Sequence, residues 1–153
     1  MREQFFIQLH SLMAENKDVF FITGDLGYGL ADKIREDFPE RFINPGAAEV
    51  AMMGIGVGLA LQGKIPFVYS ITPFLLFRPF EIIRNYINHE RIPVIMVGSG
   101  RGTDYEHDGF SHWAGDDFLI ESFLNIDKCF DCETFDLKQI IDLKKPYYLN
   151  LKR

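Results

Sequence analysis

The sequence predicts an α/β fold in which a doubly wound, mostly parallel sheet carries helices on both faces. Short runs rich in β-branched and aromatic residues alternate along the chain with segments whose apolar residues recur at helical spacing. Turn and polar residues gather in the loops after the strands, where open parallel sheets bind ligands. The 153 residues, 47% of them hydrophobic, suffice for one core, so we expect a single domain over residues 1–153.

The expected strands are short apolar runs bounded by turn residues. In chain order they are Val19–Thr23, Arg41–Ile43, Pro66–Ser70, Pro93–Gly98, Lys128–Asp131 and Tyr147–Leu151. Helical apolar periodicity covers Arg2–Ala14, Ala31–Asp37, Ala47–Gln62, Phe74–His89, Asp116–Phe123 and Leu137–Leu143. Because strands and helices alternate, successive strands are expected to run parallel through helical crossovers. The loops at the carboxyl ends of the strands are then Gly24–Leu30, Asn44–Ala48, Ile71–Phe74 and Ser99–Gly115.

Charge and hydropathy restrict the partners and the location of the protein. A net charge of −6 and a pI near 5.2 argue against nucleic acid or an anionic membrane as a general partner, since both select basic surfaces. The N-terminal Met-Arg-Glu-Gln-Phe-Phe is too polar for a secretory signal. The most apolar run, Ala47–Leu61, is shorter than the ~20 residues that span a bilayer. We therefore expect a soluble, cytoplasmic protein.

Glu49 is the exception in that apolar run. Every other residue from Ala47 to Leu61 is Ala, Gly, Val, Met, Ile or Leu, so we expect a helix buried on all sides. A buried carboxylate needs a proton, a partner or a ligand, and such groups cluster at functional sites. Alternatively, Glu49 follows Pro45-Gly46 in the first helical turn and only favours the helix dipole. The residue by itself leaves both interpretations open.

Three glycines of the same run suggest a dinucleotide fingerprint, which the spacing does not support. In Gly54-x-Gly56-x-Gly58 the third glycine of the fingerprint would fall on Leu59, and the glycines lie inside the helix rather than at its start. Glycine costs about 1 kcal/mol in a helix relative to Ala. Three of them indicate that this helix packs closely against another backbone, which could belong to another subunit.

Two further patterns have ordinary structural explanations. His107, Asp108 and His112 have an unspecific spacing for Zn²⁺, which needs three or four ligands, so we expect no metal site. Cys129 and Cys132 are spaced as Cys-x-x-Cys, but no second pair follows and the flanking acids oppose a thiolate. A structural role for these cysteines is favoured over a redox or zinc site.

Taken together and in order, the loop motifs resemble a known domain. The motifs are Asp25-Leu26-Gly27, the segment Arg41–Gly54 with Glu49 before Met-Met-Gly, Pro66-Phe67 leading to Pro73–Phe80, and His107-Asp108-Gly109-Phe110-Ser111-His112. They resemble the pyrimidine-binding domain of transketolase-like enzymes that depend on thiamine diphosphate. The resemblance covers nearly the whole chain and implies the thiamine-diphosphate-binding fold.

The resemblance implies a catalytic role for Glu49. In the enzymes that this chain resembles, a glutamate hydrogen-bonds a ring nitrogen of the cofactor aminopyrimidine and so activates the thiazolium carbon. An apolar setting strengthens that hydrogen bond and excludes water. Asp25 or Leu26 would line the same pocket, although Asp25 could instead cap the following turn. Phe74, Phe77 and Phe80 fall where the family stacks aromatic rings on the aminopyrimidine, although such a stripe is also typical of a core.

The late Asp-Gly-x-x-His motif implies substrate contacts. Asp108 and His112 match positions that contact substrate hydroxyls and move protons in sugar-processing members, although they could also form a local hydrogen-bond pair. Arg153 aligns with a phosphate-binding arginine of the family. Two departures leave the substrate open: Tyr28-Gly29 stands where a phosphate-binding serine is expected, and Arg101 lies beside Gly100, where a histidine is expected.

The length of the chain implies a partner. Full transketolases carry a second domain that binds the diphosphate through Mg²⁺ and a Gly-Asp-Gly…Asn motif, and this sequence lacks both the motif and the room. The resemblance therefore implies a split enzyme in which two copies of this chain pair with two copies of a diphosphate-binding chain. It would act on a sugar or keto acid. The alternatives are a non-catalytic regulatory or scaffolding subunit, and a flavodoxin-like ligand-binding module.

Overall fold

The computed structural model describes residues 1–130 and 133–153. Its helices are α1 (Arg2–Glu15), α2 (Asp32–Asp37), α3 (Glu49–Leu61), α4 (Thr72–Phe77), α5 (Phe80–Ile82), α6 (Phe118–Phe123) and α7 (Leu137–Asp142). Its strands are β1 (Val19–Thr23), β2 (Phe42–Ile43), β3 (Ile65–Ile71), β4 (Ile95–Ser99), β5 (Asp127–Cys129) and β6 (Tyr147–Leu151). Short 3-10 turns cover Pro39–Arg41, Glu106–Asp108 and Phe110–His112, and Ile83–His89 is π-helical.

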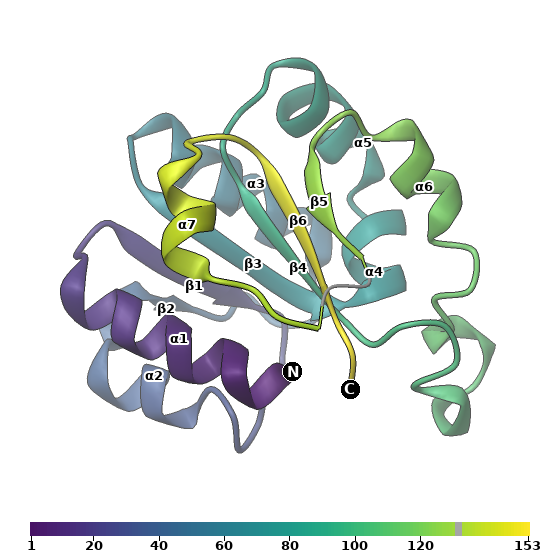
Figure 1. The fold of residues 1–153 in the computed structure, drawn as a ribbon, viewed down its shortest axis with the longest axis horizontal. Coiled ribbons are helices and arrows are strands. Elements are labelled where there is room, and N and C mark those ends of the chain that lie inside the picture. The colour runs from purple at the N-terminus through teal and green to yellow at the C-terminus, as the bar shows by residue number, and fades with distance from the viewer. Residues whose placement is uncertain (131–132) are drawn as a thin grey trace.

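The described strands form one twisted sheet in the order β2-β1-β3-β4-β6-β5 (Figure 1). All five neighbouring pairs are parallel, so every strand ends at the same edge, where the two chain termini also lie. The chain moves from β1 to β2 in one direction and reaches β3 on the other side of β1. The predicted doubly wound parallel sheet is therefore confirmed.

Helices cover both faces of the sheet. In Figure 1, α1 and α7 lie in front of the strands and α3 lies behind them. The first face buries side chains of α1, α2 and α7 with Phe21, Phe67 and Tyr69 of the strands. The second face buries side chains of α3, α4, the π-helical segment and α6 with Ile22, Val68 and Met96. Adjacent strand residues thus point into opposite cores, as a sheet that is buried on both faces requires.

Helix α1 is held to the sheet by aromatic contacts. Phe5 is fully buried, and its ring lies within 5.2–6.5 Å, centroid to centroid, of four other rings. Those rings belong to Phe6, Phe67, Tyr69 and Phe135. Aromatic side chains each bury a large apolar area and prefer such offset or edge-to-face arrangements, so Phe5 is a central anchor of this face.

The predicted single helix over Phe74–His89 is wrong. Helix α4 ends at Phe77, Arg78 and Pro79 follow, and a new helical segment begins at Phe80. Proline has no backbone N–H, and its ring opposes continuation of the preceding helix. The apolar spacing continues across the break, so periodicity does not reveal it.

One side of α3 is exposed to solvent, contrary to the expectation that the helix is buried all round; we call it the bare side of α3. Met52, Met53 and Val57 are buried, whereas Val50 and Leu61 are exposed. Of the three glycines, Gly56 faces the core, where an added Cβ would lie 2.8 Å from Val68 Cγ2. Nothing lies within 4 Å of the corresponding positions at Gly54 and Gly58. The exposed surface of α3 therefore lacks side chains of its own along these turns.

Arg41 joins the end of α1 to the sheet. Its Nη2 donates to Met13 O at 2.8 Å, and its Nη1 donates to Asn16 O at 2.9 Å and Val19 O at 3.3 Å. The bonds to Met13 O and Asn16 O satisfy carbonyl groups at the helix C-terminus, which have no partner within the helix. We expect Arg41→Met to lower the free energy of unfolding by about 1–2 kcal/mol in urea titrations, because hydrogen bonds to charged donors are worth about 1.5–3 kcal/mol before discounting for exposure.

A matched control is Arg35→Met, since Arg35 makes only an exposed ion pair with Asp32 at 3.2 Å. Such pairs contribute about 0–1 kcal/mol, so this variant should unfold almost like the wild type. Equal losses in Arg41→Met and Arg35→Met would contradict the role assigned to Arg41.

Two remaining sequence expectations meet the structure only in part. The pair Cys129 and Cys132 is not tested, because Cys132 lies outside the described residues, as does Asp131 at the end of the predicted strand Lys128–Asp131. No helix of the described residues is long and apolar enough to cross a membrane.

Candidate functional site

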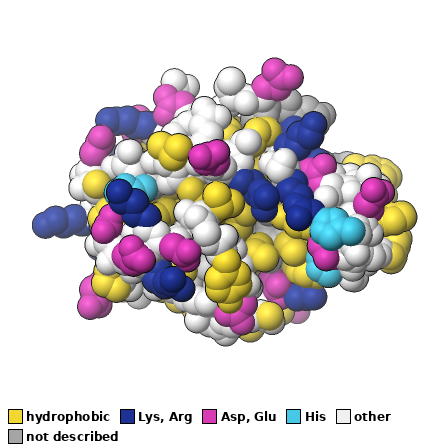
Figure 2. All heavy atoms as spheres, turned by 90° about the horizontal axis from the view of Figure 1, so that it is seen from below, with side chains coloured by type: hydrophobic (Ala, Val, Ile, Leu, Met, Phe, Trp, Pro, Cys, Tyr) yellow, Lys and Arg dark blue, Asp and Glu magenta, His cyan; other side chains and the backbone are white. Residues whose placement is uncertain are grey.

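The carboxyl ends of β1 and β3 form the switch point of the sheet. The chain leaves β1 through α2 on one face and leaves β3 through α4 on the other face. Connections that depart to opposite faces leave a crevice between adjacent strand ends, where open α/β sheets bind ligands. Figure 2 looks onto this edge and shows Lys and Arg side chains gathered beside a projecting lobe that carries histidine.

Glu49 lies at this switch point as the first residue of α3. Gly46 has a φ of +81°, which favours glycine, and Ala48 N donates to Gly46 O at 2.7 Å in the turn that starts the helix. The Glu49 side chain is only 4% exposed. The residue therefore lies in the first helical turn and is also buried.

Arg78 and Ser70 contact the Glu49 carboxylate. Arg78 Nη1 donates to Glu49 Oε2 at 2.7 Å, and Ser70 Oγ donates to Oε1 at 3.4 Å. Ser70 is at the end of β3, and Arg78 lies in the break between α4 and α5. The buried charge is therefore compensated mainly by one arginine, which is itself 45% exposed.

Phe74 and His112 extend this group of side chains. The Arg78 guanidinium carbon lies 3.7 Å from the centre of the Phe74 ring, a close cation–π contact. The imidazole of His112 packs edge-on to the same ring, with centroids 4.8 Å apart. A continuous row of contacts thus runs from α3 to the loop of residues 102–114, which we call the late loop. Its members are Glu49, Arg78, Phe74 and His112.

Asp25 and Leu26 lie beside the start of α3. Asp25, with a φ of +52°, exchanges two hydrogen bonds with Asn44: Asn44 Nδ2 donates to Asp25 Oδ1 at 3.0 Å, and Asp25 N donates to Asn44 Oδ1 at 3.1 Å. Leu26 is half-buried against the first core. Gly24 permits this close approach, because an added Cβ would lie 2.8 Å from Gly46 O. The β1 loop is therefore fixed to the turn that carries Glu49.

Phe77 and Phe80 occupy different surroundings from Phe74. Phe77 is 40% exposed at the end of α4. Phe80 is half-buried, and its ring centre lies 5.6 Å from that of Phe123 in α6. The regular spacing in sequence therefore does not give the three rings the same surroundings, and Phe80 is separated from the other two by the helix break at Arg78-Pro79.

Asp108 and Arg153 belong to a second group at the same edge. His107 connects them: its Nε2 lies 3.2 Å from Asp108 Oδ2 and 3.0 Å from Arg153 Nη1. The Arg153 guanidinium also lies 4.6 Å from the centre of the Tyr105 ring. Among the contacts of the described residues, none joins this group directly to Glu49.

The two groups share one loop. Ala114 N donates to Gly102 O at 2.8 Å, an isolated antiparallel bridge that closes the base of residues 102–114. Tyr105 anchors the loop: its hydroxyl lies 2.9 Å from Ser99 Oγ and accepts from Arg2 Nη1 at 3.1 Å. Burial raises the pKa of the neighbouring Tyr69 hydroxyl above its ordinary value, so that hydroxyl stays neutral near pH 7.

Sequence reasoning missed Arg78, Ser70 and Asn44. A buried carboxylate needs a cation or donors, and Arg78 is a charged residue inside an otherwise apolar Phe-rich segment. The need of Glu49 for a cation, together with this unusual position of an arginine, could have indicated Arg78 from the sequence. Neither Ser70 nor Asn44 has a local pattern that distinguishes it, since their partners lie 21 and 19 residues away along the chain.

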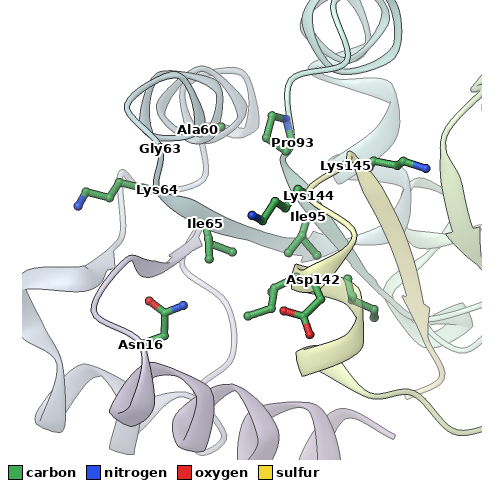
Figure 3. Close-up of a pocket in the computed structure, with 12 residues that line it drawn as sticks. Asn16, Ala60, Gly63, Lys64, Ile65, Pro93, Ile95, Asp142, Lys144 and Lys145 are labelled. Carbon is green, nitrogen blue, oxygen red and sulfur yellow. The ribbon is translucent and has the colours of Figure 1, made fainter.

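A cavity of about 440 Å³ opens at the opposite, amino edge of the sheet (Figure 3). It is lined by Lys64, Lys144, Lys145 and Asp142 over apolar residues that include Ile65. Helices α3 and α7 end there, and lysines near helix C-termini offset the negative end of the dipole. Lys64 also pairs with Asp18 at 2.7 Å. Open parallel sheets bind ligands at the carboxyl ends of their strands, and this cavity lies at the other edge. We therefore place the functional site at Glu49.

No group of three or more His, Cys, Asp or Glu side chains within residues 1–130 and 133–153 is arranged to hold a metal ion. The His107, Asp108 and His112 side chains separate into the two groups described above, with His112 on Phe74.

Comparison with known proteins identifies relatives of this site. Residues 1–120 match the family described as the transketolase pyrimidine-binding domain. The putative transketolase C-terminal section of Methanocaldococcus jannaschii is 34% identical over 123 residues, covering 77% of this chain and 39% of that protein. One of the apulose-4-phosphate transketolase subunits of Actinobacillus succinogenes is 31% identical over 108 residues, covering 70% of this chain and 35% of that protein.

A solved structure agrees over nearly the whole chain. A split-gene transketolase, determined as an inactive beta4 tetramer, superposes with a TM-score of 0.84 and 30% identity. The match covers 99% of this chain and 50% of the solved chain. This chain therefore spans about half or less of the length of these relatives.

Proposed function

Because the chain belongs to the family of transketolase pyrimidine-binding domains, we propose that it is the small subunit of a split thiamine-diphosphate-dependent transketolase. Residues 1–153 would act as one domain that supplies Glu49 to the cofactor aminopyrimidine. The observation that carries the proposal is a carboxylate at the switch point that is 4% exposed and is joined to an aromatic ring, that of Phe74, through the Arg78 guanidinium. The substrate would be a sugar or a keto acid.

The side chains at Glu49 suit an aminopyrimidine. Glu49 offers a buried hydrogen-bond acceptor and Phe74 offers an aromatic face, and the Arg78 guanidinium contacts both. A planar group with N–H donors, the Arg78 guanidinium, already satisfies both contacts. A heteroaromatic ring with a protonated nitrogen could do the same, through a hydrogen bond and offset stacking.

Thiamine diphosphate, when bound, supplies the thiazolium carbon that takes up the carbonyl fragment. Glu49 would hold a proton against a pyrimidine nitrogen, in a setting where burial strengthens the hydrogen bond and excludes water. Asp25 and Leu26 would line the pocket from the β1 loop, and Phe77 and Phe80 would complete its aromatic surroundings. His112 would move protons at the substrate, which Asp108 and Arg153 would also contact.

A partner chain would complete the cofactor site. A separate chain would hold the diphosphate through Mg²⁺, and two copies of each chain would place the sites at their interfaces. Relatives that are themselves named as transketolase subunits support a divided enzyme. The bare side of α3, with Gly54 and Gly58 open and Val50 exposed, suits close approach by another backbone. Cytoplasmic location remains part of this proposal.

The direct test is affinity purification of the tagged chain from its native cells with thiamine diphosphate and Mg²⁺ present. We expect a stoichiometric partner with a Gly-Asp-Gly…Asn motif, and a purified complex that binds the cofactor and transfers carbonyl fragments. A chain that is recovered alone and folded, and that binds no cofactor, would instead favour the non-catalytic alternative.

The glycines of α3 allow a sharper test of the interface. Gly54→Glu and Gly58→Glu should stabilise the isolated chain by roughly 0.5–1 kcal/mol, because glycine is a poor helix former and nothing lies near either position. The same variants should recover at least about tenfold less partner, since a side chain would block close packing. Urea unfolding measures the first effect and quantitative pull-down the second.

Ser11→Glu on the exposed side of α1 is the matched control and should recover the partner normally. Normal recovery with Gly54→Glu and Gly58→Glu would place the interface on another surface.

A further inference from the structure

Arg78 occupies the two contacts that the proposed function assigns to the cofactor. Its Nη1 donates to Glu49 Oε2 at 2.7 Å, and its guanidinium carbon lies 3.7 Å from the centre of the Phe74 ring. The guanidinium is planar, cationic and a donor, which are the properties that a protonated aminopyrimidine ring would present to the same two side chains.

We propose that Arg78 is an internal plug of the pyrimidine site, which stabilises the cofactor-free chain and must leave Glu49 and Phe74 before the cofactor binds. This inference rests on the proposed function. It adds a residue that neither the sequence motifs nor the comparisons single out, and a state of the site that competes with the cofactor.

The surroundings of Glu49 explain why a plug is needed. The carboxylate is 4% exposed, and its other partner, Ser70 Oγ, is neutral and 3.4 Å away. A buried carboxylate with only that contact would be strongly unfavourable. Arg78 supplies the compensating charge until another donor replaces it.

The surroundings of Arg78 explain how it can leave. Its side chain is 45% exposed, so the guanidinium reaches solvent on one side. It stands in the break between α4 and α5, next to Pro79, rather than inside a regular helix. A rotation of the long side chain could therefore expose Glu49 and the Phe74 ring without moving either helix.

A permanent partnership is the competing arrangement. If Arg78 stayed on Oε2 while the cofactor used Oε1, Arg78 would support cofactor binding and its loss would weaken affinity. A plug makes the opposite prediction, because apparent affinity is reduced by the fraction of molecules in the open state. A plug closed about 90% of the time, for example, weakens apparent binding about tenfold.

The experiment is calorimetric titration of thiamine diphosphate, with Mg²⁺, into the purified complex with its partner chain. We expect Arg78→Met to bind the cofactor at least about fivefold more tightly than the wild type, and Arg78→Lys to lie between them because lysine keeps the charge but does not cover the Phe74 face. Arg84→Met is the matched control, since Arg84 is exposed and donates to Asn85 at 3.0 Å, and it should bind within about twofold of the wild type.

Thermal melting gives a second readout that does not depend on turnover. Without cofactor, Arg78→Met should melt at a lower temperature than the wild type, because Glu49 loses its charge partner. Added cofactor should raise the melting temperature of Arg78→Met more than that of the wild type. If Arg78→Met does not fold, Arg78→Lys decides: tighter binding supports the plug, and unchanged or weaker binding overturns it.

The outcomes separate this inference from the function on which it rests. A wild-type complex that binds cofactor, with Arg78→Met binding equally or more weakly, overturns the plug and leaves the proposed function standing. A wild-type complex that binds no cofactor overturns both.

Discussion

The complex that carries Glu49→Gln is expected to turn over at least about 10²-fold more slowly than the wild type while assembling normally. Glutamine keeps the size of the side chain and one acceptor oxygen, but it cannot hold or release a proton at the pyrimidine nitrogen. Positioned acids and bases contribute about 10²–10⁴-fold to enzymatic rates. The measurement is kcat at saturating cofactor and substrate, with partner stoichiometry checked in the same preparation.

Glu81→Gln is the control. Glu81 is an exposed acid on α5, and the substitution makes the same chemical change away from the site. Its kcat should match that of the wild type. Full activity in Glu49→Gln would remove the catalytic role from Glu49 and, with it, the main support for the proposed function.

The second large effect concerns stability. Phe5→Ala should lower the free energy of unfolding by about 3–5 kcal/mol, the usual range for truncating a buried phenylalanine. Phe5 is fully buried and contacts four other rings between α1 and the sheet, so little of the resulting cavity can be filled by relaxation. A domain has only about 5–15 kcal/mol in total, and the loss should therefore be clear in urea titrations of the isolated chain.

Ile7→Ala on the same helix is the matched control. Ile7 is 62% exposed, so its truncation should change the free energy of unfolding by no more than about 0.5 kcal/mol. Similar losses in Phe5→Ala and Ile7→Ala would contradict the role assigned to the aromatic contacts of Phe5.

The sequence predicted the fold well because its signals are local. Each strand run is short and bounded by turn residues, and each crossover is long enough for one helix, which leaves a parallel sheet as the natural arrangement. The prediction of one helix over Phe74–His89 was wrong because it relied on the same local signal. The apolar spacing continues through Arg78-Pro79, and the prediction gave that spacing more weight than the proline. The expectation for α3 failed because composition cannot tell a helix buried in its own chain from one with an open side.

The site was predicted less completely because its contacts are not local. Glu49 and Phe74 were identified, and the structure places them around the same guanidinium. Arg78 is 29 residues from Glu49 in sequence, and no spacing rule relates them. Phe80, by contrast, shares the spacing of Phe74 but faces Phe123. Residue type therefore indicated the chemistry, whereas tertiary packing sets which side chains contact one another in this structure.

The bridge between Gly102 and Ala114 closes the late loop into a cassette, a segment whose residues could be exchanged as a unit. Its two ends meet at one backbone hydrogen bond, so the length and sequence between them can change at small entropic cost, provided that Tyr105 keeps its contact with Ser99 of β4. The cassette carries Asp108 and His112, whereas Glu49 lies outside it. If Asp108 and His112 contact the substrate as proposed, exchange of these residues between relatives would change the substrate while Glu49 stays the same, which offers a route for one ancestral subunit to diversify.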